Sequence, residues 1–231
     1  MHMNPGWDFV FAGYLIVKRF DSLMLTPDDM AYRGPDRESL STHLDTNDVT
    51  MPAGWQQATS EQLRAAEDVF GLIARQEDVE QILATVNAHD NAYDVIACCI
   101  EGRALDHLFT KDVADVLALP DTEDVEAFLR ARNRLSRRPK PPDGKVLGYD
   151  VATLGPIVHS VVFRGILPAV EAPFAPYRPL LNGSGLLPDI RIAHAVLADY
   201  MRLASRDIGD CYVYEVRDPL LHHASLTRNK N

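Results

Sequence analysis

Histidines are the residues of this chain best suited to acid–base chemistry, and three of them have a useful neighbour. His89 precedes Asp90, His107 follows Asp106, and His159 precedes Ser160, as an acid–base pair or an activated nucleophile would require. The sequence contains no GxSxG elbow, no HExxH helix and no paired CxxC segments. We therefore expect no catalytic residue, no metal site and no cofactor. A hydrolase or nucleotide-processing enzyme that uses His159, Ser160 or His107 is the alternative.

The three cysteines form neither a disulfide framework nor a zinc site. Cys98 and Cys99 are adjacent, and Cys211 lies alone. A thiolate nucleophile at 98–99 is one interpretation, but the apolar residues on both sides favour buried, unreactive thiols. This cysteine usage is typical of a reducing compartment, so we expect a cytoplasmic protein.

Charge is distributed unevenly along the 231 residues, whose formal net charge is −10. Up to Leu129 there are 24 acidic and 8 basic residues, whereas 130–140 holds six basic residues and no acidic one. Such an acidic chain is a poor binder of nucleic acid or anionic membranes, and its field would attract a basic protein. The alternative is that the acids lie on solvated helix faces and at helix N-termini.

The candidate partner-binding residues are acidic side chains of the first 129 residues and one tryptophan. They are Asp28, Asp29, Trp55, Glu77, Asp78, Glu80, Asp112 and Asp115. If charge steers a partner, the docking face lies within 28–126.

One strand is expected near the start of the chain. The apolar run from Phe9 to Val17 is rich in aromatic and β-branched residues, and Gly13 within it suits a bulge. The run is less than half the length that spans a bilayer, so we expect no membrane anchor. Because a lone strand leaves both edges unpaired, we expect it to join the C-terminal strands.

Short amphipathic helices are expected through the middle of the chain. An irregular connection over 26–58 precedes a capping box that begins at Thr59 and predicts a helix start there. Apolar residues over 79–86 repeat at helical spacing. The segment 93–108 fits a third helix, although 95–100 fits a short strand equally well.

The clearest break is the proline-rich segment 137–144, which cannot continue a helix. After it, the pattern predicts strands over 146–151, 157–163 and 211–216. A helix over 190–203, with Asp189 as its cap, is expected before the last strand.

These elements predict an α+β fold: an acidic, helical N-terminal half with one early strand, packed against a small antiparallel or mixed sheet formed mainly by the C-terminal part. The expected organisation is a helical region 1–136, a linker 137–144 and a β-rich region 145–231. Since the early strand is expected to join the later ones, a single interleaved domain is the alternative. We see no internal repeat in the sequence.

Short motifs in the last third resemble bacterial immunity-type proteins encoded beside polymorphic toxins. The residues that carry this resemblance are Leu147–Val151, His159–Ser160, Leu181–Asn182, Gly185–Leu187, Asp189 and Tyr212–Val216. The resemblance implies a cytoplasmic binding protein that neutralises a cognate toxin, and it carries no catalytic residues.

The acidic charge agrees with this resemblance. A toxin that acts on nucleic acid or nucleotides presents a basic active site, which an acidic partner can occlude. The expected partner is therefore a basic toxin, with no direct binding of nucleic acid or membrane. The alternatives are the enzyme described above and a structural adaptor domain.

Overall fold

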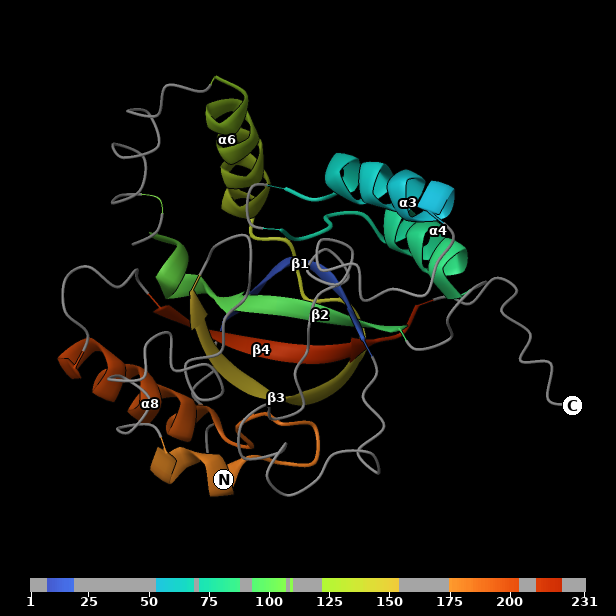
Figure 1. The fold of residues 1–231 in the computed structure, drawn as a ribbon. Coiled ribbons are helices and arrows are strands. Elements are labelled where there is room, and N and C mark those ends of the chain that lie inside the picture. The colour runs from blue at the N-terminus through green and yellow to red at the C-terminus, as the bar shows by residue number, and fades with distance from the viewer. Residues whose placement is uncertain are drawn as a thin grey trace, which may run out of the picture.

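The fold is α+β, with four strands in one sheet and helices packed around it. The computed structural model describes residues 8–18, 53–68, 71–87, 93–106, 109, 122–153, 175–203 and 211–221. Its elements are β1 Phe9–Lys18, α3 Ala53–Ala66, α4 Gln76–Asn87, β2 Tyr93–Glu101, α6 Thr122–Ser136, β3 Gly144–Thr153, the 3-10 helix η1 Ala175–Leu180, α8 Ile190–Leu203 and β4 Cys211–Pro219 (Figure 1). None of the helices in these ranges has the length and hydrophobicity needed to cross a membrane.

The sheet is antiparallel throughout and has the strand order β1-β2-β4-β3. Two of its strands precede the proline-rich segment and two follow it. The early strand does join the later ones in one sheet, but through β2 rather than by direct pairing. The sheet is therefore built from both halves of the chain.

Helices cover both faces of this sheet. Ile96, Cys98 and Ile100 of β2 point to one face, where they share a cluster of buried residues with Phe128 and Leu135 of α6. The alternate residues of β2 point to the other face. There α4 covers the β1–β2 half and α8 covers the β4–β3 half (Figure 1).

Two predicted elements differ from those observed. Residues 93–101 form a strand, which settles the choice between helix and strand at that position. The helix expected to start at Thr59 begins at Ala53 instead, and Thr59 lies fully buried in its middle. The capping-box pattern gave the wrong start for this helix, because a threonine hydroxyl can also be buried within a helix. The predicted strand over 157–163 lies outside the described residues.

The proline-rich segment packs against the sheet. The backbone N–H of Phe11 donates a 2.8 Å hydrogen bond to the carbonyl of Pro139, on the outer edge of β1. Farther along, the N–H of Leu220 donates to the carbonyl of Asp143 at 2.9 Å. The segment therefore contacts β1 and the residue that follows β4.

Each edge strand carries a bulge that ends in a Gly-Tyr pair. The register of β1 shifts at Gly13, as predicted, and that of β3 shifts at Gly148; both glycines have φ of 152°. The tyrosine after each glycine exchanges two backbone hydrogen bonds of 2.8 and 2.9 Å with a later residue. Tyr14 pairs in this way with Ile73, and Tyr149 pairs with Leu187.

The turns that precede these two partners are alike as well. Gly71 and Gly185 have φ of 69° and 66°, in the left-handed region that favours glycine. The N–H of each glycine donates to the carbonyl three residues earlier, on Asp68 or Asn182, at 2.9 and 2.8 Å. A helix and then a central strand follow each turn, α4 and β2 in the first half and α8 and β4 in the second.

The two halves are thus related by an approximate two-fold axis in the middle of the sheet. Cys98 pairs with Val216 across β2 and β4, and the flanking pairs Ala97–Arg217 and Cys99–Glu215 exchange places under this rotation. The chain therefore contains an internal structural repeat, contrary to our expectation. The sequence hides it because the repeat keeps only Gly-Tyr, Gly-Leu and the apolar spacing, separated by loops of different length.

Candidate functional site

Helix α4 presents the predicted acidic residues on the surface. Val79, Ile82, Leu83 and Val86 recur at helical spacing and are buried against the sheet, as their pattern predicted. Packing of this apolar stripe turns the rest of α4 outward. Glu77 is consequently exposed, and Asp78 and Glu80 are partly exposed.

Arg75 offsets part of this acidic cluster. Its Nε lies 3.6 Å from Oε2 of Glu77 and 3.7 Å from Oδ2 of Asp78. Exposed pairs of this kind contribute little to stability because water screens them. Glu80 instead accepts a 2.7 Å hydrogen bond from Nε2 of Gln76, which leaves its charge uncompensated by that contact.

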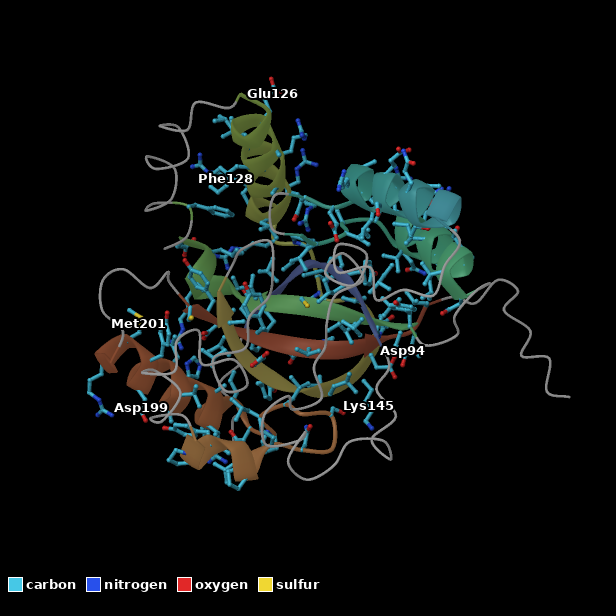
Figure 2. All side chains as sticks on the ribbon, in the orientation of Figure 1. Asp94, Glu126, Phe128, Lys145, Asp199 and Met201 are labelled. Carbon is cyan, nitrogen blue, oxygen red and sulfur yellow. The ribbon has the colours of Figure 1, made fainter. Side chains whose placement is uncertain are left out.

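The negative potential of α4 reaches the sheet beneath it. Burial raises the pKa of Tyr14, and the charges of Glu77 and Glu80 raise it further. Glu61 is exposed on α3, which packs against α4. Asp94 is also exposed, at the start of β2 (Figure 2), but it alternates with Tyr93 and Val95 and so points to the face of the sheet opposite α4. We call Glu61, Glu77, Asp78 and Glu80 the acidic face.

The structure brings only some of the predicted partner-binding residues together. Glu77, Asp78 and Glu80 share the first two turns of α4. Trp55 belongs to α3, but its side chain is not among those described. Asp28, Asp29, Asp112 and Asp115 lie outside the described residues, as do His107, His159 and Ser160.

All three cysteines are free thiols inside the protein. Cys98 and Cys99 are buried, which confirms the burial inferred from their apolar neighbours, and Cys211 is buried as well. Burial is the main cause that raises the pKa of Cys99 far above its usual range. Its thiol therefore stays protonated and unreactive at neutral pH.

A second group of charged residues, which the sequence did not indicate, lies at the end of β2. Glu101 is only 4% exposed, and its Oε1 lies 2.6 Å from Nε of Arg103 and 3.6 Å from Nε2 of His194 on α8. Nη2 of Arg103 lies 3.0 Å from both ring nitrogens of His194. The only signal was a glutamate that ends an apolar strand two residues before an arginine. In the described ranges, no three His, Cys, Asp or Glu side chains form a metal-binding group.

His194 provides a sensitive test of this group. Burial lowers its pKa from 6.5, Glu101 acts to raise it and Arg103 acts to lower it. We expect Glu101→Gln to lower the pKa of His194 further and Arg103→Gln to raise it, measured by NMR titration of the ring protons. Shifts in the same direction in both variants would show that direct charge interactions do not control this histidine.

The lowered pKa also fixes the sign of the pH dependence of stability. Below about pH 6.5 the unfolded chain binds more protons at this histidine than the folded chain does, so acidification through this window destabilises the fold. Replacing His194 by glutamine should flatten the dependence of the unfolding free energy on pH below about pH 7.

The described residues that carry the resemblance to immunity-type proteins belong to the repeat unit of the second half. Gly148 and Tyr149 make the bulge, and Asn182 and Gly185 make the turn. Asp189 begins α8: its Oδ1 accepts a 2.8 Å hydrogen bond from the N–H of Arg191, as the predicted cap would. These described residues are architectural. Comparison of the chain with protein-family models, with curated proteins and with solved structures found no match.

Proposed function

We propose that this chain is an immunity-type binding protein that neutralises a basic toxin by docking its acidic face over the toxin's active site. One observation carries the proposal: α4 buries an apolar stripe against the sheet while it presents Glu77, Asp78 and Glu80 outward. A rigid helix holds these carboxylates at fixed spacing. A basic cleft that binds phosphates would recognise such an array by charge complementarity.

The surroundings of α4 extend this surface. In residues 57–68 and 71–87 the basic residues are Arg64 and Arg75, and acidic residues outnumber them. Charges on this scale act over roughly 8–10 Å at physiological salt, so they mainly speed the encounter with a partner. Apolar anchors near the face must then supply the slow dissociation.

Co-expression tests the function itself. The polypeptide encoded beside this chain is expressed alone and together with it, and cell growth and co-purification are measured. The proposal expects a toxic polypeptide, restored growth on co-expression and a stable complex. A neighbour that is harmless alone and does not co-purify would reject the proposal.

Charge removal tests the docking face. The triple variant Glu77→Gln, Asp78→Asn, Glu80→Gln should slow association with the toxin by about ten-fold at low salt and flatten its salt dependence, because the steering charges are lost. Stopped-flow association rates at several salt concentrations measure both effects.

A matched control carries the same change of net charge elsewhere. The exposed residues Glu126 on α6, Asp106 after β2 and Asp218 on β4 are replaced by their amides. Glu126 has its own exposed partner, Arg130 at 3.5 Å, much as the acids of α4 have Arg75. If both triple variants slow association equally, net charge rather than the acidic face would be responsible.

A further inference from the structure

A cavity of about 210 Å³ lies beside the Glu101 group, under α8 rather than under α4. Its lining residues are Glu101, Arg103, Ala104, Leu197, Met201, Cys211, Tyr212 and Val213. They come from the end of β2, the helical turn over 102–106, α8 and the start of β4. Figure 2 shows Met201 on α8, far from Asp94, and its side chain is 58% exposed at the rim.

Comparison of the two halves explains why this space is hollow. The rotation that exchanges Cys98 with Val216 also relates Gly102 to Leu220, whose N–H groups donate to the carbonyls of Asp8 and Asp143. The residue that follows is Arg103 in one case and Leu221 in the other. Under α4, Leu221 packs against the apolar cluster of the first half. Under α8, the corresponding residue is Arg103, whose side chain contacts Glu101 and His194 instead. The space under α8 therefore lacks the apolar side chain that its counterpart contains.

The charged wall of the cavity is electrically balanced. The carboxylate of Glu101 has the guanidinium of Arg103 at 2.6 Å. Burial lowers the pKa of His194 below 6.5, so this ring is neutral at pH 7. A charged ligand would lose its hydration without meeting an uncompensated charge, which is unfavourable. The wall therefore selects against ions of either sign.

The volume limits the size of an occupant. An apolar cavity of about 150 Å³ is large enough to hold benzene, so this one has room for a six-membered ring with a small substituent. Leu197, Val213 and Ala104 offer carbon atoms for it to contact. Burial of apolar surface supplies the driving force.

We infer that this cavity is a binding site for a compact, uncharged molecule built on a single aromatic ring. The site is separate from the proposed docking face, because α8 packs on β3 and β4 whereas α4 packs on β1 and β2 (Figure 1). Its occupancy is therefore independent of whether the chain binds a toxin.

Three probes with one aromatic ring and a small substituent test the inference: benzyl alcohol, benzoate and benzylammonium. Each is titrated into the full chain at pH 7, and the methyl signals of Leu197 and Val213 are followed by NMR. We expect saturable shifts with benzyl alcohol in the millimolar range, and at least ten-fold weaker binding of both ions. No saturation with benzyl alcohol, or binding of an ion as tight as that of the alcohol, would overturn the inference.

Two alanine-to-leucine variants locate the site. Ala104→Leu fills the cavity and should weaken benzyl alcohol binding at least ten-fold, whereas Ala84→Leu adds the same atoms to an exposed position of α4 and should leave binding unchanged. Should Ala104→Leu not fold, Met201→Trp at the exposed rim covers the entrance and should have the same effect. A folded cavity variant that retains full affinity would show that the ring binds elsewhere.

Discussion

Replacing Gly148 by alanine is expected to lower the free energy of unfolding by about 3 kcal/mol, since the new methyl group has no space and the backbone there disfavours any side chain. A Cβ at this position would lie 2.7 Å from Cβ of Leu186 and 2.8 Å from the carbonyl oxygen of Leu187. Both contacts are with the turn that pairs with the bulge. The turn must move away, which breaks the two backbone hydrogen bonds between Tyr149 and Leu187.

Gly183 provides the control for this prediction within the same turn. A Cβ at Gly183 would meet no atom within 4 Å, so Gly183→Ala should leave stability nearly unchanged. Urea unfolding followed by circular dichroism gives both values. Because the two-fold rotation relates Gly13 to Gly148, Gly13→Ala should lower the free energy of unfolding by a similar amount. A Cβ at Gly13 would lie 2.7 Å from Cβ of Leu72. Equal stability of the Gly148 and Gly183 variants would contradict this account of the bulge.

Local sequence signals predicted much of the fold. Helix α8 was predicted over its whole length, Ile190–Leu203, because apolar spacing defines its body and Asp189 begins it. The hydrogen bond and ion pair with Arg191 hold the pKa of Asp189 at about 2. Strand β2 was ambiguous because it is buried on both faces, so neither the period of a helix nor that of a strand is visible in it.

The features that were missed depend on contacts between distant parts of the chain. Arg103 meets His194 across 91 positions, and no local pattern marks such a pair. The cavity exists because Arg103 stands where the other half has Leu221, which only the sheet register reveals. The candidate docking acids of α4, by contrast, were found from local charge and apolar spacing alone.

Arg134→Met is expected to destabilise the fold by about 2–3 kcal/mol, because it removes the group that links the first bulge to its turn. Nη2 of Arg134 donates 2.6 Å hydrogen bonds both to the carbonyl of Ala12 and to Oδ2 of Asp68. The side chains of Arg134 and Asp68 are 23% and 13% exposed, so water replaces the lost contacts only in part. Methionine keeps the apolar stem and removes the charge.

The second half suggests how the loss can be repaired. There Asn182 occupies the position of Asp68, and its Nδ2 donates directly to the carbonyl of Leu147 at 2.8 Å, with no arginine between them. A carboxylate cannot donate, so the first half needs Arg134 as an intermediary.

The double variant Asp68→Asn, Arg134→Met should therefore recover at least half of the stability that Arg134→Met loses, since the new amide can donate to Ala12 as Asn182 donates to Leu147. Urea unfolding of the wild type, both single variants and the double variant measures this recovery. Asp68→Asn alone should be mildly destabilising, because Arg134 then loses its charged partner. If the double variant is no more stable than Arg134→Met, the new amide side chain at position 68 does not make the hydrogen bond to Ala12 that Asn182 makes to Leu147, although the two turns have similar backbones.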